Sequence, residues 1–281
     1  MKKIWQKNEK RQRKWMRYSL QGVLFALCFL LGRAIALWQS IPVSAQLPKT
    51  QQPPPFARLA VVIDDFGYHG EGTEEMLSLS IPFTAAVMPF SAYSKEDAGA
   101  VEAAGKEAII HMPMESLTGK SEWVGEKGIF RYMNEEEIRS RIEEAFSIVP
   151  KAVGMNNHMG SAVMEDKQTL KIVMEEVGKR QGFFLDSMTS PKTKGAAVAG
   201  EGNVPFLQRD VFLDSTDSLA VVKENIRKAA QVAKDQGSAI AIGHVGPEGG
   251  RITAQALEAL APILEEEGVQ FVFLSELAGQ K

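Results

Sequence analysis

The sequence predicts an α/β fold in which parallel strands curl into a barrel-like sheet. Short apolar runs alternate with amphipathic segments through seven or eight units after residue 58, and such alternation builds a parallel sheet. Proline or glycine stands at the joints between units, as at Pro150 and Gly237. Eight units favour closure into a barrel over an open, doubly wound sheet.

The first 45 residues have the composition of an export signal. Residues 1–17 carry eight basic groups and one acid, Gly22–Gly32 is uncharged, and Val43–Ala45 is a small-x-small site. These three parts make a secretory signal peptide. The alternative is an uncleaved N-terminal membrane anchor extended past Arg33, but the short uncharged run favours cleavage. Either way, we expect the rest of the chain to be extracytoplasmic, either secreted or anchored facing the cell wall or periplasm. It would meet the membrane only through this segment.

Residues 46–57 contain three consecutive prolines and are expected to form an extended linker, followed by one domain over residues 58–281. The residues after position 45 hold 23 basic and 34 acidic groups, a net charge of −11. This acidity argues against nucleic acid as a partner, because phosphate binding needs clustered lysine and arginine. The only cysteine, Cys28, lies within the export signal, so the domain has neither a disulfide nor a thiol nucleophile.

The strands and helices of the domain are predicted from the spacing of apolar residues. Apolar runs bounded by turn residues predict strands at Leu59–Ile63, Phe83–Met88, Ala108–Ile110, Ala152–Met155, Phe183–Leu185, Val211–Leu213, Ala239–Ile242 and Val269–Leu274. Apolar residues that recur every three or four positions predict helices, among them Glu135–Ile148, Lys167–Arg180, Leu219–Gln236 and Ala254–Glu267. Parallel strands end on one face, so polar residues that follow them should converge there.

Acidic residues and histidines follow several of these runs. Asp64 and Asp65 end the first run, and three of the four histidines, His111, His158 and His244, come after three others. Three histidines at such positions beside a carboxylate pair argue against coincidence. Two histidines and one carboxylate around an open position form the usual ligand set of a hydrolytic zinc site. No histidine pair lies four residues apart on a helix, which excludes the H-E-x-x-H class.

Other polar residues near strand ends have more than one interpretation. Glu115 is a metal ligand, a substrate contact or a loop carboxylate. Asp186 orients a histidine, holds a substrate hydroxyl or caps the next turn. Arg209 pairs with an active-site carboxylate and keeps it ionised, or it forms a surface ion pair. Asn156 and Asn157 hydrogen-bond to substrate or occupy left-handed turn positions, and the turn is slightly favoured.

Taken together, these motifs resemble the divergent polysaccharide deacetylase family, a remote branch of the NodB-homology carbohydrate esterases. The matching segments occur in the family's order between about residues 58 and 275: Val62–Gly67, His111–Glu115, Asn156–Ser161, Phe184–Ser187 and Ile242–His244. The resemblance implies a distorted (β/α) barrel with about seven strands and a divalent metal, usually zinc. It also implies a substrate that is an N-acetylated envelope polysaccharide, peptidoglycan-like or chitin-like.

The resemblance also implies roles for single residues. Asp65 and His111 match metal ligands, and Asp64 matches the base that activates water. His244 matches the histidine that protonates the leaving amine. Two further residues would support the site: Asp186 and Arg209.

One departure from the superfamily's pattern concerns the third metal ligand. Typical members place two metal histidines four residues apart, but the fourth residue after His111 is Glu115. The missing ligand must come from elsewhere, and His158 is the natural candidate. A metal with Glu115 as a fourth protein ligand would instead favour the alternative function, an exported non-catalytic module that binds glycan or protein and carries a structural metal.

Overall fold

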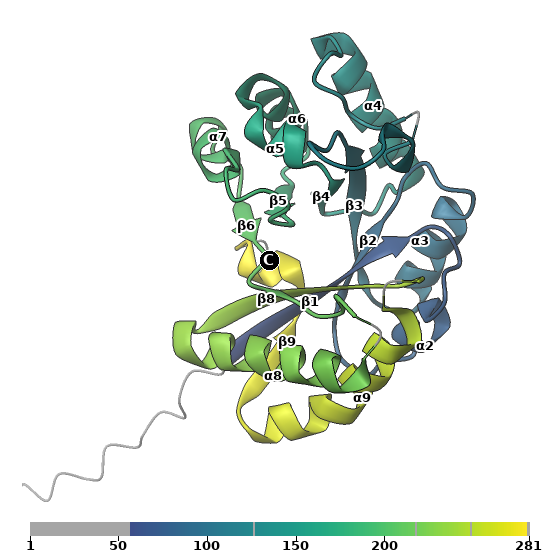
Figure 1. Ribbon diagram of the computed structural model, residues 1–281, viewed down its shortest axis with the longest axis vertical. Coiled ribbons are helices and arrows are strands. Elements are labelled where there is room, and N and C mark those ends of the chain that lie inside the picture. Colours follow the sequence, from purple (N-terminus) through teal and green to yellow (C-terminus); the bar gives the residue numbers. More distant parts are fainter. Residues whose placement is uncertain (1–56, 126, 217, 248, 280–281) are drawn as a thin grey trace, which may run out of the picture. The chain divides into compact units, whose positions relative to one another are not determined.

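The computed structural model of the 281-residue chain describes residues 57–125, 127–216, 218–247 and 249–279. The predicted export signal and nearly all of the predicted linker lie outside these residues. Figure 1 shows a strongly curled sheet with helices around its outer side. No helix of the described segments is long and apolar enough to cross a membrane.

The strands of the described residues pair in parallel throughout. They are β1 (Ala57–Phe66), β2 (Thr84–Val87), β3 (Glu107–Met114), β4 (Gly154–Met159), β5 (Phe183–Asp186), β6 (Phe206–Gln208), β7 (Val211–Phe212), β8 (Ser238–His244) and β9 (Val269–Val272). The helices are α2 (Thr73–Leu77), α3 (Ser94–Ala103), η1 (Ser121–Trp123), α4 (Glu135–Ile148), α5 (Ser161–Glu165), α6 (Lys167–Lys179), α7 (Gly195–Gly202), α8 (Leu219–Gln236), α9 (Gly250–Glu266) and α10 (Leu274–Leu277).

The sheet runs in the order β6-β5-β4-β3-β2-β1-β8-β7, and β9 also pairs with β1. Because β8 pairs with β1 along Arg58–Asp64, the other edge of β1 is shared by β9 near its start and β2 near its end. The predicted distorted (β/α) barrel is confirmed. Strand β6 was not predicted, because its three residues follow Pro205 and form no recognisable apolar run.

Local capping explains where the predicted helices begin and end. Asn134 accepts a hydrogen bond from the backbone N–H of Glu137, whose side chain accepts one from the Asn134 N–H. This reciprocal pair begins α4 at the predicted residue. Helix α8 ends at Gly237, whose φ of 89° is a left-handed conformation that glycine adopts without a steric penalty.

Alternation along the strands separates two apolar layers. In β1, Leu59, Val61 and Ile63 belong to the cluster that packs against the helices. Ala60 and Val62 belong to a second cluster, made mainly of strand residues, on the inner side of the curled sheet. Successive side chains of a strand point to opposite faces. A residue's place in this alternation therefore indicates whether it faces the interior, where the polar residues at the strand ends meet.

Candidate metal centre

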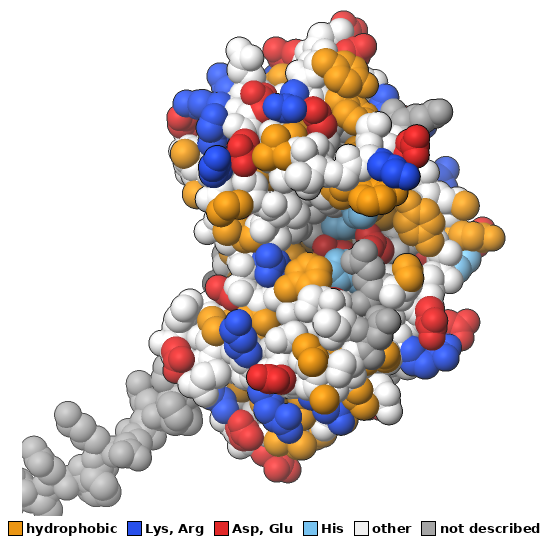
Figure 2. Space-filling view, in the orientation of Figure 1, with side chains coloured by type: hydrophobic (Ala, Val, Ile, Leu, Met, Phe, Trp, Pro, Cys, Tyr) orange, Lys and Arg blue, Asp and Glu red, His pale blue; other side chains and the backbone are white. Residues whose placement is uncertain are grey.

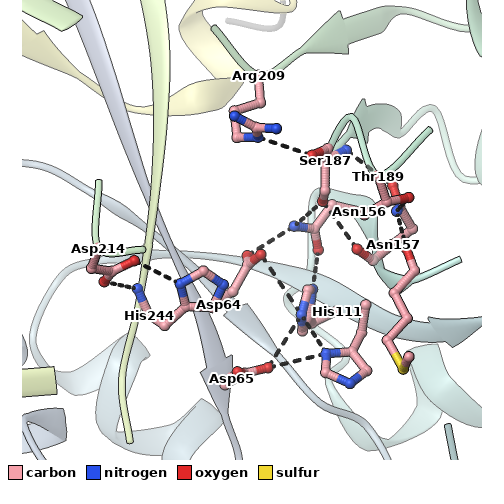
Figure 3. A network of polar contacts seen from close by, with 12 residues as sticks. Asp64, Asp65, His111, Asn156, Asn157, Ser187, Thr189, Arg209, Asp214 and His244 are labelled. Carbon is pink, nitrogen blue, oxygen red and sulfur yellow. Dashed lines mark hydrogen bonds and ion pairs between the residues drawn. The ribbon is translucent and has the colours of Figure 1, made fainter. Parts of the chain in front are cut away.

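The alternation directs polar side chains from four strands toward the interior. Asp64 continues the inner row of β1, His111 that of β3, and His244 that of β8. On β4, Met155 faces the helices, so Asn156 and His158, one and three residues later, point to the interior. Register places Asp64 beside His244 and His111 beside Asn156. These residues therefore form one polar layer, and Figure 3 shows the hydrogen bonds and ion pairs that connect Asp64, His111 and Asn156 within it.

Asp65 joins this layer only because β1 is irregular at its end. Regular alternation would turn its side chain toward the helices. Instead, the β1–β2 register shifts between Ile63 and Phe66, which marks a bulge, and Asp65 has a φ of 69°. A bulge redirects a side chain, and aspartate tolerates the left-handed conformation better than most residues. Both neighbouring carboxylates can therefore face the same site.

Three side chains meet at the centre of the site. Asp65 Oδ1 lies 3.3 Å from His111 Nε2 and 3.3 Å from His158 Nδ1, and the two nitrogens are 3.2 Å apart. In the part of the chain that the structure describes, this is the group of acidic and histidine side chains placed to share a metal ion. Figure 2 shows histidine and acidic side chains in the hollow of this face.

Asn156 determines which nitrogen of His111 faces this group. Its Oδ1 lies 2.7 Å from His111 Nδ1, and its Nδ2 donates to Asp64 Oδ1 at 2.8 Å. An amide oxygen can only accept, so Nδ1 carries the proton and Nε2 turns a lone pair toward Asp65 and His158. Metal-binding histidines are commonly oriented in this way by a partner on the other nitrogen.

The geometry fits a divalent cation. Asp65 Oδ1 is buried, yet it has no hydrogen-bond partner among the described residues. A lone-pair nitrogen and a carboxylate oxygen 3.3 Å apart repel each other unless a cation or proton lies between them. A tetrahedral zinc site with bonds of about 2.0–2.1 Å separates its ligand atoms by about 3.3–3.4 Å. The three measured separations are close to that spacing, and they account for three of four tetrahedral positions.

Burial and the two imidazoles affect the paired carboxylates differently. Burial raises the pKa of Asp64 above its usual range, and the opposing effects of His111 and His244 are smaller. Burial also acts on Asp65, but hydrogen bonds and positive charge from His111 and His158, in the metal-free state in which these rings can carry the extra proton, hold its pKa well below the usual range. Asp65 is therefore the permanently ionised member of the pair, and Asp64 is the one better suited to take up a proton.

His244 faces the site from the other side of β1, with a carboxylate behind it. Its Nδ1 lies 2.9 Å from Asp214 Oδ1, and its backbone N–H donates to Asp214 Oδ2 at 2.7 Å. Thr253 Oγ1 donates to Asp214 Oδ2 as well, at 2.8 Å. Burial lowers the pKa of His244, but Asp214 and Asp64 outweigh it and raise that pKa to about 9. His244 is therefore protonated at neutral pH.

Glu115 lies outside the metal group. Arg131 holds both of its oxygens, with Nη2 donating to Oε1 at 2.8 Å and Nε to Oε2 at 3.1 Å. This ion pair lowers the pKa of Glu115. Of the two candidates for the third ligand, the structure brings His158 to Asp65 and His111 and does not bring Glu115. Glu115 instead closes the base of the loop that follows β3.

The remaining predicted residues hold the loop after β5. Asp186 accepts from the Met188 N–H at 2.7 Å and from Thr193 Oγ1 at 2.7 Å, so it caps this turn and does not orient a histidine. Asn157 accepts from the Ser187 N–H at 3.0 Å. The favoured left-handed turn for Asn156 and Asn157 is wrong, because both belong to β4.

Arg209 makes its direct contacts with backbone and an aromatic ring. Its Nε donates to the backbone oxygen of Ser187 at 2.9 Å, and its guanidinium lies over the Phe212 ring. It forms no ion pair with a carboxylate among the described residues. A surface ion pair is therefore not formed, and Arg209 anchors this backbone. Its charge still acts on two carboxylates without direct contact: burial raises the pKa of Asp186, and Arg209 is among the groups that oppose this, while Asp186 and Asp64 in turn favour the charged form of Arg209.

A comparison with known families matches residues 61–278 to the model of the divergent polysaccharide deacetylases. The chain belongs to this family. The match includes every residue of the candidate metal centre, so the deacetylase family predicted from the motifs is confirmed.

Relatives and solved structures share sequence or fold with this chain. An uncharacterized protein of Haemophilus influenzae is 33% identical over 221 residues, covering 79% of this chain and 76% of the relative. An uncharacterized protein from Agrobacterium tumefaciens, ATU2773, has a similar structure, with a TM-score of 0.72, 19% identity, and coverage of 80% and 90%. The Bc1960 peptidoglycan N-acetylglucosamine deacetylase has a TM-score of 0.51, 15% identity, and coverage of 82% and 91%. At these identities the two structures establish the shared fold alone.

Two residues of this deacetylase-family site were missed by the sequence analysis. Asp214 was not considered, although it directly follows the predicted strand Val211–Leu213 and so occupies a strand end like the other acidic residues. Asn156 was considered mainly as a turn residue. Its position two residues before His158 would have placed both side chains on one face, had β4 been extended to Met159.

Proposed function

We propose that this protein is a metal-dependent deacetylase that hydrolyses N-acetyl groups of an envelope polysaccharide, peptidoglycan-like or chitin-like. The observation that carries the proposal is the separation of the site into a cation-binding group and a proton-handling group on the two sides of β1. Asp65, His111 and His158 would hold the ion, and zinc suits two imidazoles and one carboxylate. A bound divalent ion supplies Lewis-acid polarisation of the acetyl carbonyl and activation of water.

The protein's own residues would then move the protons. Asp64 accepts the proton of the attacking water, because burial raises its pKa while Asn156 occupies only Oδ1. Among the described residues, Asp64 Oδ2 accepts no hydrogen bond and lies 3.7 Å from His111 Nε2, which leaves this oxygen available for a proton. His244 is protonated at neutral pH and donates to the departing amine. Asp214 orients the His244 ring and stabilises its charge.

The location of the protein in the cell is inferred from the sequence alone. We infer that residues 1–45 direct the chain out of the cytoplasm, as a cleaved signal or a membrane anchor, since they combine a basic segment, an apolar segment and a small-residue site. The acidic domain would then meet its polysaccharide substrate in the cell envelope.

The test combines metal content with acetate release. The full chain, purified and loaded with zinc, is expected to release acetate from N-acetylglucosamine oligomers or peptidoglycan fragments. Asp64→Asn should keep the metal and lose activity by roughly a hundredfold to ten-thousandfold, because only the proton acceptor is removed. Loss of metal from this variant would contradict the separate roles of Asp64 and Asp65. Stoichiometric zinc without acetate release from any glycan would favour the non-catalytic binding module.

A further inference from the structure

Asp97 is a buried carboxylate that the proposed proton transfers do not use. It lies in the first turn of α3, and its side chain is fully buried. A buried carboxylate destabilises a fold unless hydrogen-bond donors or positive charges surround it. The groups that Asp97 contacts therefore indicate which part of the molecule it serves.

Asp97 holds one short segment, Gly67–His69, which begins two residues after Asp65. Asp97 Oδ2 accepts hydrogen bonds from the backbone N–H of Gly67 at 2.5 Å and from that of His69 at 3.3 Å. Asp97 Oδ1 lies 2.8 Å from His69 Nδ1. Backbone N–H groups that converge on one anion form a concave site for it. Here the anion is the protein's own carboxylate, so α3 is tied to the segment that leaves β1.

The His69 ring lies between two carboxylates. Its Nδ1 faces Asp97, and its Nε2 lies 3.0 Å from Glu96 Oε2. A neutral imidazole has a single N–H, so only the protonated ring can donate to both carboxylates. The ring also packs against Tyr93, with centroids 4.1 Å apart. His69 therefore supplies a positive charge to Asp97 and covers it from the solvent side.

The backbone that Asp97 holds has an unusual conformation. Asp65, Gly67 and His69 have φ values of 69°, 117° and 50°. The left-handed region is unfavourable for residues other than glycine, so Asp65 and His69 adopt it only where their surroundings impose it. The conformation of Asp65 matters most, because it belongs to the bulge that turns this side chain toward the metal centre.

Two sets of hydrogen bonds hold the loop after Asp65. The backbone oxygens of Phe66 and Gly67 accept from the N–H groups of Met88 and Tyr93, at 2.8 and 2.9 Å. The N–H groups of the loop donate to Asp97. Only the second set depends on a side chain. A substitution of Asp97 therefore releases the N–H groups of the loop and leaves its carbonyl groups held.

We propose that Asp97 is a positioning residue for the metal centre, which holds Asp65 in the bulged conformation that places its Oδ1 beside His111 and His158. Zinc affinity then depends on a side chain that is not itself among the three ligands. The inference rests on the cation-binding part of the proposed function, and it depends neither on the reaction nor on the substrate.

The test measures the zinc affinity of the full chain by competition with a chelator, together with its unfolding in urea. Asp97→Ala should weaken zinc binding by about 10- to 100-fold, as for other residues that orient metal ligands. Asp97→Asn keeps an oxygen for the Gly67 N–H but loses the ion pair with His69, so it should weaken zinc binding by about two- to fivefold. This milder variant decides the question if Asp97→Ala does not fold.

Two control variants separate positioning from stability and from charge. Asp186 is equally buried and also accepts hydrogen bonds from a loop, the one after β5, but β5 supplies no residue to the candidate metal centre. Asp186→Ala should therefore lower stability and leave zinc affinity unchanged. Glu96→Gln removes an exposed charge from the same turn of α3, and it should also leave zinc affinity unchanged.

The outcomes distinguish this inference from the proposed deacetylation. Wild-type zinc affinity in folded Asp97→Ala, or in Asp97→Asn where the alanine variant does not fold, would overturn the positioning role alone. Equal losses of affinity in Asp97→Ala and Asp186→Ala, or in Asp97→Asn and Glu96→Gln, would also overturn it, in favour of a general effect of stability or charge. If the wild type binds zinc tightly, Asp97→Ala binds it weakly and no glycan releases acetate, the positioning role stands and the proposed deacetylation fails.

Discussion

The polar groups on the two sides of β1 differ in whether their charges have partners. On the side of β3 and β4, Asp65 Oδ1 and two histidine nitrogens face one another within 3.3 Å, and the buried oxygen lacks a hydrogen-bond donor among the described residues. On the side of β7 and β8, His244 places both its ring N–H and its backbone N–H on Asp214. The first group therefore lacks a positive partner, whereas in the second group Asp214 accepts hydrogen bonds from both the backbone and the ring of His244.

This difference separates a site for a cation from a site for a proton. Buried polar atoms without partners are costly, so the first group is stable when a positive ion completes it. The Asp214–His244 pair needs no such ion, because the imidazolium itself supplies the positive charge. Asp64 lies between the two sides and is connected to the first by Asn156. The following variants test how far the two sides are independent.

The largest effect is expected from His111→Ala. The variant loses a ligand atom and also the partner of Asn156, so zinc content should fall to near background. Deacetylase activity should fall by roughly a thousandfold or more, since the Lewis acid is lost. Metal analysis and acetate release measure the two losses together. Full zinc binding in this variant would show that the ion is held elsewhere.

Asp214→Asn should impair proton transfer by His244 and leave metal binding unchanged. Activity is expected to fall about a hundredfold at unchanged zinc content. The alkaline limb of the pH–rate profile, near the His244 pKa of about 9, should move to lower pH, because burial then acts without the opposing carboxylate. The measurement is a pH–rate profile of both proteins.

The same variant makes a prediction for stability. The raised pKa of His244 stabilises the folded state fully below the unfolded value of about 6.5, and this contribution is lost as pH rises through about 9. The loss of stability between these pH values should therefore be smaller in Asp214→Asn than in the wild type. Urea unfolding at several pH values would show it. If both proteins lose the same stability between these pH values, the raised pKa of His244 does not come from Asp214.

Asn156→Leu should weaken the connection between Asp64 and the metal group. Leucine is close in size but can neither accept from His111 nor donate to Asp64. Zinc affinity is expected to fall by about 10- to 100-fold, as for other partners that orient metal ligands. Competition with a chelator measures it. Asn157→Leu is the neighbouring control, and it should reduce stability with a smaller effect on zinc affinity, because Asn157 contacts the loop at Ser187.

The smallest effect is expected from Glu115→Gln. Zinc content should not change, because Arg131 and not the metal group holds this carboxylate. The half-exposed ion pair should contribute less than about 1 kcal/mol to the free energy of unfolding. The depressed pKa of Glu115 means that this contribution is present above its unfolded value and is lost as pH falls. A loss of zinc would make Glu115 a ligand after all.

Much of the site could be predicted from strand alternation. Asp64, His111 and His244 each continue the inner row of a strand whose apolar residues are evident in the sequence. The same alternation places Asp186 and Asn157 on the opposite side, where they hold a loop. The sequence analysis left the role of Asp186 open and placed Asn157 in a turn, because it considered position along the chain and not the face of the strand.

The sequence by itself determined the alternation of strands and helices except for the short β6, the polar strand ends and the family, because these depend on local spacing and residue type. Only the tertiary structure decided that Asp65 meets His111 and His158, because a bulge reverses the side that alternation assigns to it. It also decided that Asp214 supports His244 and that Glu115 belongs to Arg131. Such partners lie 16 to 30 residues apart and meet only through strand pairing and loop closure, which no local pattern encodes.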